Sequence, residues 1–159
     1  GGARIVVAQG LNEPWHRETG FFDLQNWNPN MNKAAEGAAV AAAQAFLLAF
    51  NAQDHAALAA SLNYPHVRLA VGKFVTYDSA EAFLVRCKVN KAQLEAEGWH
   101  HTNTNVIEII QSGPDKVHLR LEIDRCHEDD TVYNKFDTLW IATRQDGHWG
   151  IQFRSSYLR

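Results

Sequence analysis

The stretch KVHLRLEIDRC, residues 116–126, decides the fold. From Val117 to Ile123 every second residue is aliphatic, and a period of two is typical of a β-strand with one buried face. The turn residues 113–115 precede this strand and the polar segment 128–130 follows it. The pattern therefore predicts a central strand with a neighbouring strand on each side.

The same signals extend the sheet toward the C-terminus. They predict one strand over 101–111 before the central strand and another over 132–143 after it. Asp146-Gly147 is a strong hairpin signal, and it leads to a last strand over 148–157. The final sixty residues therefore predict a four-stranded antiparallel meander.

The preceding part of the chain mixes helical and strand periods. It predicts, in chain order, helices over 32–51 and 54–63, strands over 66–71 and 74–77, and a helix over 78–98. The second helix must end before Tyr64-Pro65, because proline disfavours a helical residue ahead of it. The order indicates an α+β fold with the helices on one face of a strongly curved sheet.

Length and composition limit the function classes. The chain has 159 residues, of which 46% are hydrophobic and 21% charged, as in a single globular domain. The net charge of −3 and the absence of a dense Lys/Arg run argue against a nucleic-acid or membrane partner. The apolar run 34–50 contains Glu36 and Gln44 and is short for a membrane span.

The chain divides into an N-terminal arm, residues 1–31, and a domain, residues 32–159. The arm is rich in aromatic residues among Asn, Gly and Pro, and we expect it to dock on the body of the domain or on a second subunit. Cys87 and Cys126 form no CxxC pair, so we expect two reduced thiols and a cytoplasmic location.

Three segments carry a resemblance to a known family. They are Asn63-Tyr64-Pro65-His66-Val67, Trp99-His100-His101-Thr102, and the run 145–151 that leads to Ser155-Ser156. Together with the order of elements, they resemble the nuclear transport factor 2-like superfamily, which includes ketosteroid isomerase-like and SnoaL-like proteins. The resemblance implies a cystatin-like α+β cone, in which a curved antiparallel sheet wraps around the helices and encloses a ligand cavity.

The inward face of strand 132–143 depends on the preceding turn. A four-residue turn puts Phe136, Thr138 and Trp140 on the cavity side, whereas a five-residue turn puts Asp137 there instead. We favour the five-residue turn, which buries Asp137 and sends Trp140 to the outer face. Burial raises the pKa of a carboxyl group, so Asp137 is the first candidate for a general base.

Histidines supply the next candidates for proton transfer. His66 begins one strand and His101 begins another, and the resemblance brings both strand starts near the cavity. Either could form a dyad with Asp137, because imidazole exchanges protons near neutral pH. Five further residues are expected to bind the substrate or line its cavity: Arg125, Arg154, Tyr133, Trp99 and Tyr64.

These residues predict a small enzyme that needs no cofactor. The adjacent pair His100-His101 and the lack of an HExxH motif argue against a metal site. We expect an isomerase, dehydratase or cyclase, a lyase or isomerase of the SnoaL-like type, that moves a proton on a mainly apolar small molecule. The alternative is a non-catalytic module that binds a ligand or a partner. A homodimer through the outer sheet face is expected in either case.

Overall fold

The computed structural model describes residues 4–7 and 32–158. Its elements are β1 (Arg4–Val7), α1 (Lys33–Ala52), α2 (His55–Ala60), β2 (Leu62–Ala70), β3 (Lys73–Tyr77), α3 (Ala80–Ala96), β4 (His101–Ser112), β5 (Lys116–Cys126), β6 (Val132–Gln145) and β7 (His148–Ser156). The predicted order of three helices and six strands is confirmed over 32–158. The aromatic residues of the N-terminal arm, and so its expected docking, lie outside the described residues.

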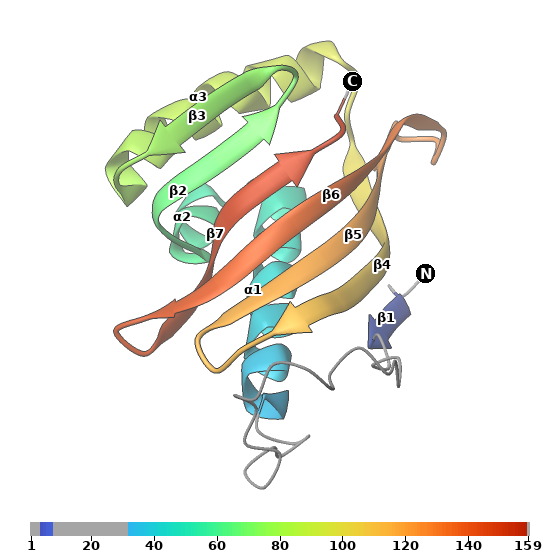
Figure 1. Ribbon diagram of the computed structural model, residues 1–159. Coiled ribbons are helices and arrows are strands. Elements are labelled where there is room, and N and C mark those ends of the chain that lie inside the picture. Colours follow the sequence, from blue (N-terminus) through green and yellow to red (C-terminus); the bar gives the residue numbers. More distant parts are fainter. Residues whose placement is uncertain (1–3, 8–31, 159) are drawn as a thin grey trace, which may run out of the picture.

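The strands form one curved sheet in the order β1-β4-β5-β6-β7-β2-β3. The sheet is mixed rather than antiparallel throughout, because β2 runs parallel to β7 and β1 runs parallel to β4. Figure 1 shows α1 and α2 behind the sheet and α3 beside β2 and β3. The α+β cone expected from the sequence is therefore the observed fold.

Helix α1 fills the concave side of the sheet. By length and apolar composition it would be long enough to span a membrane, yet Ala39, Ala43 and Phe46 are buried in the core. The Phe46 ring packs edge-on against Trp140 of β6, with 4.9 Å between ring centroids. From β5, Val117, Leu119 and Leu121 are fully buried beneath this helix, as the alternation predicted.

The inward face of β6 differs from the prediction. Five residues do separate Cys126 from its partner Val132, but Arg125 pairs with Asn134, so Tyr133 is an extra residue in β6. This β-bulge shifts the alternation by one position and places Phe136 opposite Ile123. Phe136, Thr138 and Trp140 therefore face inward, and Asp137 faces outward.

Gly150 allows β7 to run close beside the start of β2. A Cβ atom at this position would lie 2.6 Å from the carbonyl carbon of Leu62 and 2.8 Å from the backbone nitrogen of Asn63. The Asn63 side chain donates hydrogen bonds to the backbone carbonyls of Thr143 and His148 at the same place. A glycine is needed here because backbone atoms occupy the space of any side chain.

Both described cysteines are free and buried, as expected. Cys87 lies on α3 and Cys126 at the end of β5. Burial raises the pKa of each thiol, which keeps the thiol protonated and unreactive.

Candidate functional site: a cavity lined by arginines

A cavity of about 660 Å³ lies between α1, α3 and the inner faces of β2, β3 and β7. Four aromatic side chains contribute to its apolar wall: Phe46, Phe50, Tyr77 and Phe83. Their rings pack against neighbouring aromatic rings, with centroids 5.4 Å apart for Tyr77 and Phe83. The wall therefore offers rigid apolar surface for the body of a small molecule.

Arg68 and Arg154 line the same cavity from two neighbouring strands. They are direct register partners in the parallel pair of β2 and β7, and both are half-buried. The side chain of Arg68 forms no hydrogen bond or ion pair with any residue that the structure describes. Burial and then the charge of Arg68 lower the pKa of Arg154 to about 9. The cavity thus holds two adjacent cations without a carboxylate between them.

His66 lies directly behind Arg154. Its side chain is fully buried, Nδ1 lies 2.9 Å from the carbonyl oxygen of Ile151, and Nε2 lies 3.1 Å from Nε of Arg154. Burial and then the neighbouring Arg154 lower the pKa of His66 to about 3. The imidazole is therefore neutral at physiological pH.

Arg154 is also held by an aromatic ring. Its guanidinium carbon lies 4.6 Å from the centroid of the Phe46 ring, a cation–π contact. Since the Phe46 ring also packs on Trp140, one chain of contacts runs from α1 through the core to the arginine. This support fixes Arg154 where an anion can reach it.

Arg125 is the one cavity arginine paired with a carboxylate among the described residues. Its Nη1 donates to Glu97 over 3.1 Å, and its guanidinium stacks over Phe136 at 5.8 Å. The Tyr133 hydroxyl also donates to Glu97, over 2.9 Å. Burial and this hydrogen bond raise the pKa of Tyr133 to about 12, so the hydroxyl stays protonated.

The described lining carries an excess of positive charge. Its cationic side chains are Arg68, Lys73, Arg86, Arg125 and Arg154, and its one carboxylate is Glu97. Arg86 makes a long hydrogen bond of 3.4 Å to the amide oxygen of Gln93 on the same helix. The electrostatic potential in such a basic cleft attracts anions.

The expected placement of Asp137 is wrong. Its side chain is 58% exposed on the outer face of the sheet, and its ion-pair partner there is Arg120, at 4.0 Å. The bulge at Tyr133 is the physical reason, because it inverts the alternation along β6. The expectation that Trp140 lies on the outer face is wrong for the same reason, since Trp140 is buried beneath α1.

The two candidate histidines have different surroundings. His101 is paired with Asp130 over 3.3 Å at the start of β4, and it does not line the cavity. His66 contacts Arg154 behind the cavity wall rather than any described carboxylate. No dyad of either histidine with Asp137 is present among the described side chains.

The predicted substrate-binding residues divide into two groups. Arg125 and Arg154 line the cavity, as expected. Tyr133, Trp99 and Tyr64 lie outside its lining: Tyr133 binds Glu97, Trp99 donates to Thr102, and Tyr64 donates to the carbonyl oxygen of Ala59.

The prediction missed Arg68 and Glu97. Arg68 shares its parity on β2 with His66 and Ala70, and that shared parity was the available signal for an inward face.

Among the residues that the structure describes, no group of three His, Cys, Asp or Glu side chains could hold a metal ion.

Comparison with known proteins gives a family but few functions. A family model described as "NTF2-like protein (DUF6841)" matches residues 35–154. No curated protein matches the sequence.

Solved structures share the fold at low sequence identity. A ketosteroid isomerase-like protein from Erwinia carotovora atroseptica is 17% identical with a TM-score of 0.59, and the match covers 83% of this chain and 98% of that one. An NTF-2 like protein of unknown function from Shewanella oneidensis is 19% identical with a TM-score of 0.62, covering 77% and 98%. A cystatin-like domain of unknown function from Nostoc punctiforme is 12% identical with a TM-score of 0.64, covering 79% and 78%.

Proposed function

Since the chain belongs to the NTF2-like family whose model matches residues 35–154, we propose that its cone cavity binds a small organic anion with an apolar body. The observation that carries the proposal is the pair Arg68 and Arg154, two neighbouring half-buried cations without a described carboxylate partner. A bound anion would relieve their mutual repulsion and form charge-assisted hydrogen bonds in a partly desolvated site.

The apolar wall supports the second half of the proposal. Phe46, Tyr77 and Phe83 are buried side chains that end at the cavity. Burial of apolar ligand surface against them contributes about 25 cal/mol for each Å² removed from water. A carboxylate on an aromatic or aliphatic body matches both the arginines and this wall.

Binding fits the residues better than the proton-transfer reaction expected from the sequence. The expected base, Asp137, is on the outer face. The carboxylate of the described lining is Glu97, and it accepts hydrogen bonds from both Arg125 and Tyr133. Oε2 of Glu97 is thus engaged by both donors and holds Arg125 and Tyr133 in place. We therefore favour the ligand-binding module over the isomerase or lyase.

Matched ligands test the proposal. The affinities of benzoate, 2-naphthoate and decanoate are measured by isothermal titration calorimetry beside those of their neutral amides. Hydrogen bonds to charged groups contribute about 1.5–3 kcal/mol, so we expect at least one acid to bind about tenfold or more tightly than its amide. Equal affinity for acid and amide across the set, or no binding by any of them, would contradict the proposal.

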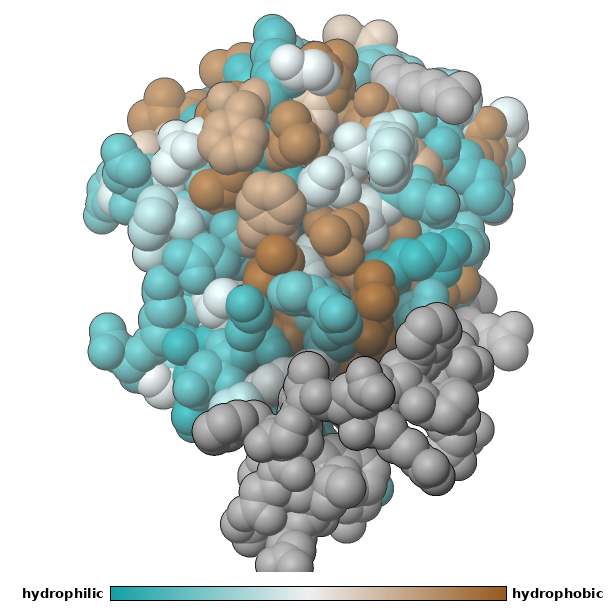
Figure 2. Space-filling view, viewed as in Figure 1, coloured by the Kyte–Doolittle hydropathy of each residue, from teal (hydrophilic) through white to brown (hydrophobic). Residues whose placement is uncertain are grey.

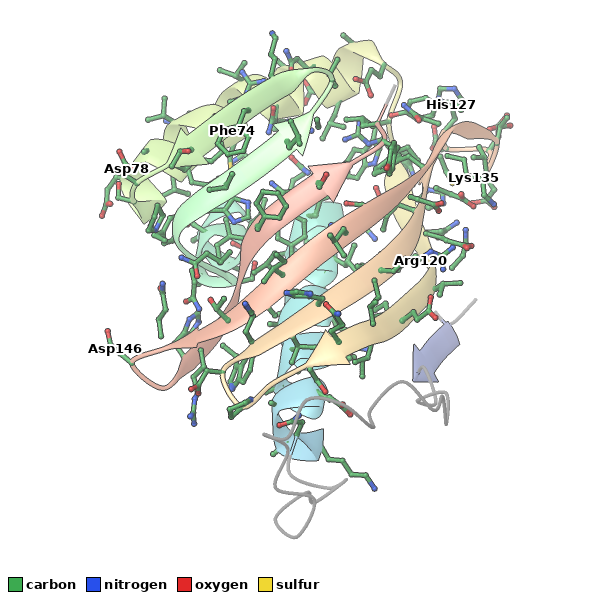
Figure 3. All side chains as sticks on the ribbon, in the orientation of Figure 1. Phe74, Asp78, Arg120, His127, Lys135 and Asp146 are labelled. Atoms are coloured by element: carbon green, nitrogen blue, oxygen red, sulfur yellow. The ribbon has the colours of Figure 1, made fainter. Side chains whose placement is uncertain are left out.

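Arginine variants test which residues cause the preference for the acid over its amide. Arg154→Met and Arg68→Met should each remove most of the preference for the acid, because methionine keeps much of the apolar stem and removes the charge. Arg120→Met is the matched control. Arg120 lies on the opposite face of the sheet, where Glu108 and Glu122 bind it (Figure 3). Its loss changes the net charge equally and should leave the preference intact.

A further inference from the structure

We propose that His66 is a positioning residue, which orients the Arg154 guanidinium so that its two Nη groups can bind an anion. The inference rests on the proposed function of the cavity and adds a residue that does not itself touch the ligand. His66 belongs to β2 and Arg154 to β7, so the contact joins the two strands that carry the cavity arginines.

The hydrogen bonds of His66 define its tautomer. The carbonyl oxygen of Ile151, 2.9 Å from Nδ1, can only accept, so Nδ1 carries the proton. In a neutral imidazole this leaves a lone pair on Nε2. The guanidinium Nε–H of Arg154, 3.1 Å away, donates to that lone pair. Both ring nitrogens are thus used, and the ring has one orientation.

This hydrogen bond determines which atoms of Arg154 remain for a ligand. Nε is occupied by His66, and Phe46 covers one face of the guanidinium plane. The two Nη groups form no hydrogen bond with another described residue. They are the donors left for an anion in the cavity that Arg154 lines, together with the guanidinium of its register partner Arg68.

The surroundings of His66 favour the neutral imidazole. The groups around the imidazole are Arg154 from β7, Arg68 from the same strand β2, Tyr77 from β3 and Phe83 from α3. None of them is a carboxylate that would stabilise an imidazolium. A protonated ring would lose its lone pair and repel the guanidinium, so the neutral form is needed for the hydrogen bond that orients Arg154.

Nitrogen NMR of the wild-type protein tests the tautomer without any ligand. We expect Nδ1 of His66 to show the shift of a protonated nitrogen and Nε2 that of an unprotonated nitrogen, unchanged between pH 7.5 and pH 5. A slowly exchanging Nε–H signal of Arg154 should accompany them. A proton on Nε2, or an imidazolium in this range, would overturn the proposal.

Two substitutions then separate positioning from packing. In His66→Gln the side-chain amide oxygen can replace Nε2 as the acceptor, whereas His66→Leu fills space without an acceptor. With 2-naphthoate as the probe, we expect His66→Leu to lose about tenfold or more in affinity and His66→Gln to recover most of it. Val117→Ala, a buried substitution away from the cavity, controls for general destabilisation.

The outcomes distinguish this proposal from the function on which it rests. If wild type shows no preference for the acid over its amide, the proposed function fails. If the preference is present and His66→Leu retains wild-type affinity, only the positioning role fails. Should His66→Leu not fold, the NMR tautomer and the comparison of His66→Gln with wild type decide, and a tenfold loss in folded His66→Gln with an intact Arg154 Nε–H signal would contradict the role.

Discussion

Arg68 on β2 and Arg154 on β7 are register partners in a parallel strand pair, and both side chains line the same cavity. Adjacent cations in a half-buried position repel each other, and burial is the largest cause that lowers the pKa of Arg68. Such a pair is costly unless it serves a ligand, because neither arginine has a described carboxylate partner.

The buried His66 should make stability depend on pH. Its pKa is about 3 in the folded protein and about 6.5 in the unfolded chain, so between these values only the unfolded chain takes up the proton. Stability from this group is complete above pH 6.5 and falls as the pH decreases toward 3. The expected loss is about 1.4 kcal/mol per pH unit in this window.

Urea unfolding at pH 7.5, 6 and 5 measures this effect, with His66→Gln as the comparison. Other titrating groups act in both proteins, so the difference in unfolding free energy between them isolates His66. We expect wild type to lose roughly 2 kcal/mol more than the variant between pH 7.5 and pH 5. Parallel pH profiles for the two proteins would show that His66 is not held neutral.

Gly150→Ala should destabilise the pairing of β7 with β2. The new methyl group would meet the backbone of Leu62 at 2.6 Å, and backbone atoms cannot move aside as a flexible side chain can. We expect a loss of about 1–3 kcal/mol, the usual range for overpacking. In a domain of this size, the melting temperature should fall by about 2–4 °C for each kcal/mol. An unchanged melting temperature would show that the two strands can separate freely here.

Asp137→Asn should have little effect. The side chain is 58% exposed, and its ion pair with Arg120 spans 4.0 Å. Exposed pairs contribute little, so the change in unfolding free energy should stay within about 0.5 kcal/mol. The affinity for 2-naphthoate should also match wild type. A large loss of affinity would mean that Asp137 reaches the ligand and that the assignment of the outer face is wrong.

The homodimer expected from the sequence stays a prediction, now with a defined surface. Leu69 and Phe74 are paired across β2 and β3 on the outer face and are 39% and 68% exposed. Figure 2 shows apolar side chains in a band across this face, and Figure 3 labels Phe74 there. Large exposed apolar patches mark interaction surfaces.

Sedimentation velocity at micromolar concentration measures the association. We expect wild type to sediment as a dimer and Phe74→Glu as a monomer, because a charge on the patch would be buried without a partner. Lys88→Glu, on α3, serves as a charged control that leaves the outer face untouched. A wild-type monomer, or a dimer that tolerates Phe74→Glu, would show that this face is not a dimer interface.

The sequence was informative where periodicity alone determines structure. The alternation from Val117 to Ile123 predicted the buried face of β5 correctly. All its aliphatic residues lie on one face, and a shift of one residue would expose them all. It failed on β6 because the bulge at Tyr133 adds one residue without a compositional signal. That single residue moved Asp137 out of the cavity and Trp140 into the core.

Arg68 escaped prediction for a related reason, whereas its partner Arg154 was expected at the cavity. On β2 the apolar residues Val67 and Leu69 share one parity, which suggests that they face the core. In the structure they face outward, and Arg68, on the same side of the sheet as the buried His66, lines the cavity. A polar inward face reverses the hydrophobic pattern, so periodicity misleads where a strand serves a binding site.

A crystal structure of the protein with the tightest-binding acid of the set tests the central claim most directly. We expect the carboxylate oxygens within about 3 Å of guanidinium nitrogens of both Arg68 and Arg154, the usual charge-assisted distance. The apolar body should lie against Phe46 and Tyr77. A ligand that binds with its carboxylate in solvent, or on the outer face of the sheet, would contradict an anion-binding cavity.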